Sequence, residues 1–260
     1  MKTQRTAFTL MEMLVVIALL GTLMGISAAG MRAADNMARE TRTRSTITKL
    51  NRFVMEKYAS YQYRRVGEPG DSAATRLTRL RQLQVWEMPD HWSEVNSSYS
   101  PYRIVSAASN KYQHDASIQS AELLYQIVIG MPEADSAFNG LEVADTDGNG
   151  LNEFVDGWGT PIQFVRWPAG HTNENYGAIS KIQNGTDPDP FDFTRSGDGY
   201  AVFPLIFSCG PDRSKGIITS VNSTKPWGVA TCGAPGEGGS SGDSAKETSM
   251  YYDNITNHNL

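Results

Sequence analysis

The stretch that decides the fold is FTLMEMLVVIALLGTLMGISAA, residues 8–29, close to the N-terminus. As an α-helix it would extend about 30 Å, which matches the thickness of the hydrocarbon core of a bilayer. Its one ionisable residue is Glu12. A carboxylate in hydrocarbon costs roughly 2.5–3.5 kcal/mol on insertion scales, so a stray acid is not expected there.

The flanking residues leave three interpretations of this segment open. Lys2 and Arg5 precede it, and by the positive-inside rule they predict a cytoplasmic N-terminus with the bulk of the chain across the membrane. A secretory signal peptide would have a shorter apolar region, although GISAAG at residues 25–30 loosely supplies a cleavage site. An ordinary signal anchor explains the length of the segment but not Glu12.

The third interpretation is a resemblance. The stretch AFTLMEMLVVIALLG, residues 7–21, resembles the N-terminus of type IV prepilins and type II secretion pseudopilins. The resemblance implies a leader at residues 1–7, cleavage between Ala7 and Phe8 by a prepilin peptidase, and N-methylation of Phe8. It also implies that Glu12, the fifth mature residue, pairs with the N-terminal amine of a neighbouring subunit. Ala7 departs from the family, in which glycine usually stands before the cut.

The composition predicts an ordinary globular head. The chain has 260 residues, of which 40% are hydrophobic and 20% charged, so about 200 residues beyond the membrane segment are enough to bury a core. The net charge of −5 argues against a nucleic-acid-binding protein, and no basic stripe contradicts that.

The helix is expected to continue beyond the membrane segment to Tyr63, because no proline interrupts it before GEPG at residues 67–70. An approximate i, i+3/i+4 stripe predicts an amphipathic second half. The stripe consists of Ala34, Ala38, Thr41, Ser45, Thr48, Val54, Tyr58 and Tyr61.

Later segments predict a mixed head. Residues 71–90 and ASIQSAELLYQIVIG (116–130) have helical periods, whereas TPIQFVRW (160–167) and YAVFPLIFSCG (200–210) indicate strands. Helices early and strands late favour an α+β fold, with a long N-terminal helix packed on a small antiparallel sheet. The expected organisation is a leader at 1–7, a transmembrane helix at 8–29, its amphipathic continuation at 30–65 and a periplasmic head at 66–260.

One acidic loop is a candidate calcium site. DTDGNGLNEFVD, residues 145–156, places oxygen ligands at alternate positions around a sharp glycine turn. As a twelve-residue calcium loop, it would use Asp145, Asp147, Asn149, the Leu151 carbonyl, Glu153 and Asp156. A true EF-hand is disfavoured, because position 12 is Asp and GWGTP follows where a helix should leave. The alternative is an acidic turn that binds no ion.

A second resemblance covers parts of the head. VDGWGTPIQFV (155–165), FSCGPDRSKGI (207–217) and YYDNITNHN (251–259) resemble stretches of the major type II secretion pseudopilin, in which the last two loops bind a structural Ca²⁺. The resemblance implies a second candidate calcium site formed by Asp212 and Asp253, with Asn254 or Asn257. Residues 64–140 match nothing in that family.

The two cysteines, Cys209 and Cys232, are too few for a disulfide scaffold. They suit either one disulfide in an oxidising compartment or two unpaired thiols.

Catalytic patterns are weak. GGSSG at residues 238–242 formally fits a nucleophile elbow, but it lies in a Gly/Ser tract without the required strand and helix. The four histidines are far apart in the sequence and no C-x₂-C occurs, which disfavours zinc. The sequence therefore predicts that the protein is not an enzyme.

Together, the residues and the resemblance predict a subunit of a type II secretion pseudopilus or a pilus-like filament. Its expected location is the inner membrane, crossed once, with the head in the periplasm. The resemblance implies other pseudopilins, a prepilin peptidase and an inner-membrane assembly platform as partners, and Ca²⁺ as a cofactor. The alternative is a signal-anchored periplasmic module that binds calcium or a glycan.

Overall fold

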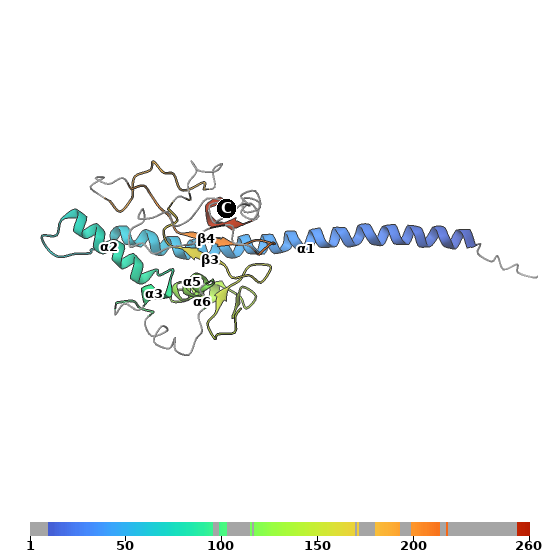
Figure 1. The fold of residues 1–260 in the computed structure, drawn as a ribbon, viewed down its shortest axis with the longest axis horizontal. Coiled ribbons are helices and arrows are strands. Elements are labelled where there is room, and N and C mark those ends of the chain that lie inside the picture. Colours follow the sequence, from blue (N-terminus) through green and yellow to red (C-terminus); the bar gives the residue numbers. More distant parts are fainter. Residues whose placement is uncertain are drawn as a thin grey trace, which may run out of the picture.

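A computed structural model shows a long helical rod that enters a head built around its far half (Figure 1). The structure describes residues 10–95, 99–102, 115, 117–169, 171, 180–192, 199–213, 217 and 254–260. Ala7, Phe8, Cys232 and Asp253 lie outside the described residues.

Helix α1 (Leu10–Ser60) runs without interruption for 51 residues and ends in a single 3₁₀ turn, η1 (Tyr61–Tyr63). At 1.5 Å per residue α1 is about 77 Å long. Its N-terminal part is long and apolar enough to cross a membrane, and none of its most apolar window is buried. The predicted continuous helix is therefore confirmed.

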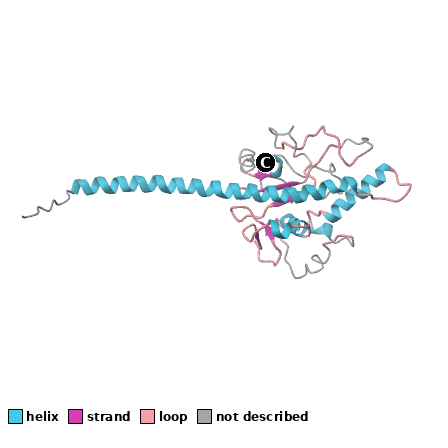
Figure 2. Ribbon diagram, turned by 180° about the vertical axis from the view of Figure 1, so that it is seen from behind, coloured by secondary structure: helices cyan, strands magenta, loops and turns pink. Residues whose placement is uncertain are grey.

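The second half of α1 is the spine of the head, as Figures 1 and 2 show from opposite sides. Its buried side chains recur every three or four residues, so they lie along one face. They are Thr43, Thr46, Ile47, Leu50, Phe53, Val54 and Tyr58.

This buried face corrects the predicted stripe. Val54, Tyr58 and Tyr61 are buried as expected, but the first part of the predicted stripe is exposed. The exposed residues are Ala34, Ala38, Thr41, Ser45 and Thr48. Small side chains bury little area, so the large apolar residues Ile47, Leu50 and Phe53 decide which face turns inward.

In the described part of the chain, four further helices follow. They are α2 (Ala73–Glu87), α3 (Trp92–Val95), α5 (Gln119–Ile129) and α6 (Ala134–Ala137). Ser72 caps α2, since its hydroxyl oxygen accepts a hydrogen bond from the Thr75 N–H at 3.1 Å. Both predicted helices exist, whereas the short helix α3 was not predicted.

Among the described residues, the strands form two small antiparallel sheets. Strand β1 (Val143–Ala144) pairs with β2 (Glu153–Phe154). In the second sheet β4 (Leu205–Ser208) lies between β3 (Gln163–Val165) and β5 (Ile255–Thr256). A final 3₁₀ turn, η3 (Asn257–Asn259), follows β5. Strands β4 and β5 contact α1, and α5 contacts β2 and β3.

One main core joins these elements, and it includes Leu50 of α1, Leu124 of α5 and Ile206 of β4. The head is thus an α+β unit wrapped on the C-terminal half of α1, with the long helix packed on an antiparallel sheet as the sequence predicts.

A buried ion network joins α2, α3 and β3. The guanidinium of Arg166, which is fully buried, pairs with Glu94 at 2.7 Å and with Asp90 at 3.5 Å. Burial alone would raise the pKa of Asp90, but the Arg166 charge and a hydrogen bond from His91 lower it to about 2. The negative charges of Asp90 and Glu94 are therefore balanced by the buried Arg166.

Candidate functional site

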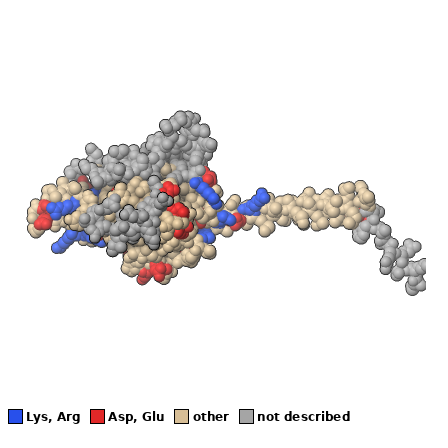
Figure 3. Space-filling model, turned by 60° about the horizontal axis from the view of Figure 1, so that its bottom comes forward, with Lys and Arg blue, Asp and Glu red and all other residues tan. Residues whose placement is uncertain are grey.

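The N-terminal part of α1 is an apolar surface without a cover. Leu10 is 84% exposed, Ile17 63% and Met31 74%. Figure 3 shows this part of the rod almost without charge, while charged side chains gather on the head and at the junction. A soluble protein does not expose so continuous an apolar surface, so it needs lipid or other helices around it.

Glu12 lies in the first turn of α1, within this apolar surface. It is the only ionisable side chain between Phe8 and Ala29. Near a helix N-terminus a carboxylate gains from the partial positive charge of the unpaired N–H groups, but this offsets only part of the cost of placing it in hydrocarbon. The chemistry of the site is thus that of an acid suited to a cationic partner.

The head is fastened to α1 by the turn DGWGTP, residues 156–161. The Gly157 N–H donates to the Thr43 hydroxyl at 2.9 Å, and Arg39 donates to the Gly157 carbonyl at 3.3 Å. A Cβ atom at Gly157 would lie 2.4 Å from the Arg39 carbonyl oxygen. Glycine is therefore required here because the turn touches the backbone of α1.

Asp156 shapes this turn. One carboxylate oxygen accepts hydrogen bonds from the N–H groups of Trp158 and Thr160, at 2.8 and 2.9 Å. The other accepts from the Ser208 hydroxyl of β4 at 2.6 Å, and the side chain is buried. The proposed twelfth ligand of the calcium loop is thus engaged in the junction between the turn, the sheet and α1.

A second fastening lies beside the 145–156 loop. Glu142 accepts hydrogen bonds from Lys49 at 2.9 and 3.0 Å and from Thr46 at 2.9 Å, both on α1. Burial would raise the pKa of Glu142, but the Asn139 N–H and these side-chain donors lower it overall. Glu142 therefore stays ionised and holds the start of β1 on α1.

Inside the loop Asp145 organises the backbone. Its two carboxylate oxygens accept hydrogen bonds from the N–H groups of Gly148, Asn149 and Gly150, at 2.8, 3.1 and 2.9 Å. Gly148 and Gly150 have φ of +76° and +92°, which only glycine adopts without strain. Asp145 thus draws the loop into the tight turn that the sequence predicts.

The other acids of the loop meet an acid of α5. Glu122, Asp147 and Glu153 each offer one carboxylate oxygen, and these atoms all lie within 4.8 Å of one another. The Asn149 amide donates to Glu122 at 2.6 Å and to Asp147 at 3.0 Å. We call these four residues the acidic group. Of the six predicted ligands, Asp147, Asn149 and Glu153 belong to it, and Asp156 does not.

Glu122 was missed by the sequence analysis, although the sequence carries a signal. In the predicted helix it lies four residues after Ile118 and three before Tyr125, so it shares a helix face with these two residues. An acid on a buried helix face is rare unless it has a partner. In the structure Glu122 is fully buried, and it accepts a hydrogen bond from the indole N–H of Trp92.

The C-terminal candidate site is only partly described. Asp212 is exposed, and Asn254 is half-buried at the edge of β5. The buried Asn257 amide donates to Asn51 and to the Pro204 carbonyl, and its oxygen accepts from the Ile206 N–H. These bonds fasten the chain end to α1 and β4. Asp253 lies outside the described residues, so this calcium site stays a prediction.

The cysteine pair is likewise a prediction only. Cys209 is buried beside Phe207 and Leu205 of β4, whereas Cys232 lies outside the described residues.

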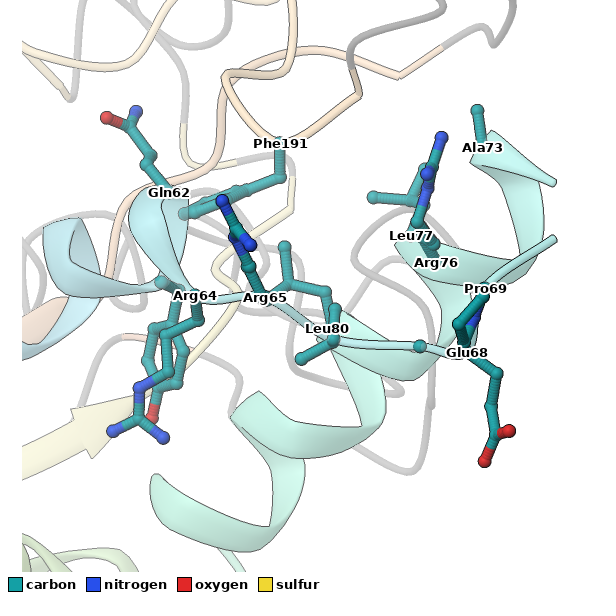
Figure 4. Close-up of a pocket in the computed structure, with 13 residues that line it drawn as sticks. Gln62, Arg64, Arg65, Glu68, Pro69, Ala73, Arg76, Leu77, Leu80 and Phe191 are labelled. Carbon is teal, nitrogen blue, oxygen red and sulfur yellow. The ribbon is translucent and has the colours of Figure 1, made fainter. Parts of the chain in front are cut away.

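A cavity of about 620 Å³ opens at the end of the head farthest from the N-terminal part of α1. It is lined by η1, the following turn and α2 (Figure 4). Its cationic side chains include Arg64, which pairs with Glu87 at 2.7 Å. None of the predicted site residues lines this cavity.

Comparison with known proteins identifies the N-terminal segment. Residues 2–28 match the family model described as the prokaryotic N-terminal methylation motif. No curated protein and no solved structure matches the chain. The chain therefore carries a prepilin-type N-terminus, followed by a long apolar helix and a head with a pilin-like α+β layout.

Proposed function

We propose that this protein is a structural subunit of a type II secretion pseudopilus or of a related type IV pilus-like filament. The proposal is carried by one observation: the methylation motif at residues 2–28 leads into an exposed apolar helix, and this helix continues unbroken into the head. The motif implies processing by a prepilin peptidase and assembly into a filament in general. The kind of filament is the further step proposed here.

Assembly would follow from the two halves of α1. The apolar half, exposed in the single chain, leaves lipid and packs against the same half of neighbouring subunits in the filament core. The Glu12 carboxylate pairs there with the N-terminal amine of the processed neighbour, which sets the register between subunits. An acid that is costly in lipid thereby favours the assembled state, because assembly supplies its partner.

The head faces outward from this core. Because the turn at residues 156–161 and the Glu142 contacts fix it to α1, any movement of the helix moves the head as one body. Before assembly the subunit would be held in the inner membrane by α1, with the head in the periplasm. Its partners would be other pseudopilins and an inner-membrane assembly platform. Its role would be mechanical rather than catalytic.

The test is Glu12→Ala in the host, with Thr22→Ala as the matched control in the same apolar segment. The Thr22 hydroxyl donates a hydrogen bond to the Leu19 carbonyl of the same helix at 2.9 Å. We expect both variants to insert into the membrane, and only Glu12→Ala to lose cross-linked multimers and sheared filaments. Normal filament incorporation of Glu12→Ala would count decisively against the proposal.

The alternative is a signal-anchored periplasmic module that binds calcium, and the acidic group between α5 and the loop is the observation in its favour. Such a module would remain monomeric in the membrane and would be insensitive to Glu12→Ala. Cross-linking in intact cells therefore separates the two functions.

A further inference from the structure

The acidic group brings together residues from two separate parts of the head. Glu122 lies on α5, while Asp147 and Glu153 lie in and after the 145–150 turn. The loop is seated beside α5 through Leu151, which packs with Trp92 and Leu123 in a small apolar cluster. The convergence of the three carboxylates is therefore built into the packing of the head.

One carboxylate oxygen of this group is buried and lacks a partner. Glu153 is fully buried, and its Oε2 accepts hydrogen bonds from the N–H and the hydroxyl of Thr146, both at 2.9 Å. Its Oε1 is buried and accepts no hydrogen bond from any of the described residues. A buried acceptor without a donor is energetically costly, so it calls for an occupant that the described part of the chain does not supply.

The charge of the group is also unbalanced. Within the described part of the chain, neither Asp147 nor Glu153 forms an ion pair with a lysine or arginine. Asp90 and Glu94, which also lie close together in the described part of the head, differ from the acidic group because both pair with Arg166.

We propose that a Ca²⁺ ion binds between α5 and the 145–153 loop, held by the carboxylates of Glu122, Asp147 and Glu153. The Asn149 amide, which now donates to two of these carboxylates, occupies the place where positive charge is needed. Its oxygen now accepts a hydrogen bond from the Leu151 N–H at 2.7 Å, and it becomes a further ligand when the amide turns toward the ion.

The ligand chemistry selects the ion. Every side chain of the group offers oxygen, and none is histidine or cysteine, so a hard cation is favoured over zinc or copper. Calcium accepts irregular arrangements of six to eight oxygens, whereas Mg²⁺ requires a near-ideal octahedron. A site formed by one rigid helix and one glycine-rich turn suits the larger, more tolerant ion.

This site differs from a local calcium loop in what it would stabilise. A twelve-residue loop binds its ion within itself, whereas here one ligand comes from α5, which packs on β2 and β3. The ion would tie the loop to the centre of the head. This inference is independent of filament assembly, because none of its residues belongs to the apolar half of α1.

The first test is calorimetric titration of CaCl₂ into the full-length protein, purified in detergent and freed of metal with EDTA. We expect one site, and we expect Glu153→Gln and Glu122→Gln each to weaken binding at least about tenfold. Both changes keep side-chain size but replace one acceptor oxygen with an NH₂ donor, so circular dichroism is used to check that each variant folds. Asp135→Asn, an exposed acid of α6, is the control that leaves affinity unchanged.

Asp212→Asn separates this site from the C-terminal candidate. Calcium binding that is lost in Asp212→Asn but kept in Glu153→Gln would overturn the proposal and place the ion in the C-terminal loops. Absence of any calcium-dependent heat, with no change in melting temperature, would overturn it as well, and would leave water or a proton as the occupant beside Glu153.

The second test places the ion by its neighbour Trp92, whose indole donates to Glu122. Tb³⁺ is a luminescent substitute for Ca²⁺ that emits when a nearby tryptophan is excited. We expect Trp92→Phe to remove most of the sensitised emission. Trp167→Phe, in a separate cluster with Val85 and Val202, should leave it largely unchanged. Equal emission from both variants would contradict the assigned position.

Discussion

Gly157 is the residue at which the head comes closest to the spine. The nearest backbone atoms of Arg39 would lie 2.4, 2.7 and 2.8 Å from a Cβ at this position. These atoms belong to α1 and cannot rotate aside as a side chain would. The contact therefore depends on the missing side chain rather than on an unusual backbone conformation.

We expect Gly157→Ala to lower the free energy of unfolding by roughly 1–3 kcal/mol, because an added methyl group forces the turn away from α1. Chemical denaturation of the full-length protein in detergent measures the change. Gly140→Ala is the matched control, since a Cβ there meets nothing within 4 Å. A loss in Gly157→Ala no larger than that in the control would contradict the close contact.

Two buried histidines give the head a sensitivity to acid. His171 and His258 stack edge to face with ring centroids 5.1 Å apart. Burial lowers the pKa of His171 to about 3, with repulsion from His258 adding to the shift. Burial also lowers the pKa of His258 to about 4, against the opposing effect of the carbonyls of Pro204 and Phe203.

Because both folded-state pKa values lie below the unfolded value of about 6.5, the unfolded chain binds more protons than the native head below that pH. The contribution of the two neutral histidines to the free energy of unfolding is therefore complete above pH 6.5 and is lost as the pH falls toward 4. Each histidine should cost about 2 kcal/mol between pH 7 and pH 5. We expect His171→Phe to remove about half of the fall in unfolding free energy that the two histidines cause between pH 7 and pH 5. Denaturation at the two pH values measures this change.

His91 affects the pH dependence of stability in the opposite direction. A hydrogen bond to Asp90 raises the pKa of His91 despite partial burial, so its contribution is present below pH 6.5 and is lost as the pH rises. His91→Asn should therefore steepen the loss of stability in acid. An identical pH dependence in wild type and His171→Phe would contradict the role of the buried pair.

The acidic loop shows what local sequence can and cannot specify. The alternation of acids and glycines around Asp147 correctly predicted a tight turn, because hydrogen bonds between close neighbours form it. It did not predict Glu122, which is 27 residues from Asn149 along the chain. Nor did it show that Asp156 accepts hydrogen bonds from Trp158, Thr160 and Ser208 at the junction with α1.

At the scale of elements, α1 is one uninterrupted helix whose two halves have different surroundings. Leu20 in the first half is 51% exposed, whereas Leu50 in the second half is completely buried in the main core. The same residue type therefore contributes to membrane insertion at one position and to folding of the head at the other.

We expect Leu50→Ala to lower the free energy of unfolding of the head by about 2–5 kcal/mol, because it leaves a cavity between α1 and the sheet. Leu20→Ala, the matched substitution on the same helix, should leave this free energy unchanged. Denaturation in detergent, followed by tryptophan fluorescence, reports on the head alone. Equal effects of the two substitutions would show that the halves are not separate.

The elements also explain why the spine was predicted more reliably than its buried face. A long helix repeats one signal over many turns, so its existence and approximate end were evident from the sequence. The face was misjudged between residues 34 and 48 because alanine, serine and threonine are tolerated on either side of a helix. Only the larger Ile47, Leu50 and Phe53 identify the side that packs on the head.

At the scale of the whole molecule, the sheet was the least predictable part. Strands β3, β4 and β5 begin at residues 163, 205 and 255 and pair across long connections. The stretches that contain β3 and β4 were recognised from their apolar residues. Strands β1, β2 and β5 contain two residues each, which is too short for a period to appear, so only the folded core reveals them.

The whole molecule is also the scale at which the N-terminus acquires its role, because Glu12 functions at a filament interface only if the leader is removed. We expect intact-mass measurement of the protein from host membranes to show a chain beginning at N-methylated Phe8. The prepilin-type motif at residues 2–28 is the basis of this expectation. Ala7 stands where the family usually has glycine, and alanine has the smallest side chain after glycine. The measurement therefore shows whether the peptidase accepts this substitute.

A peptidase that tolerates only small residues before the cut should process Ala7→Gly at least as completely as the wild type. It should leave residues 1–7 on most of the Ala7→Leu chains, and those chains should fail to assemble, since the amine that pairs with Glu12 is never released. Processed and assembled Ala7→Leu would contradict this coupling. A wild-type chain that begins near Gly30 would instead identify a secretory signal and leave Glu12 without a role in the mature protein.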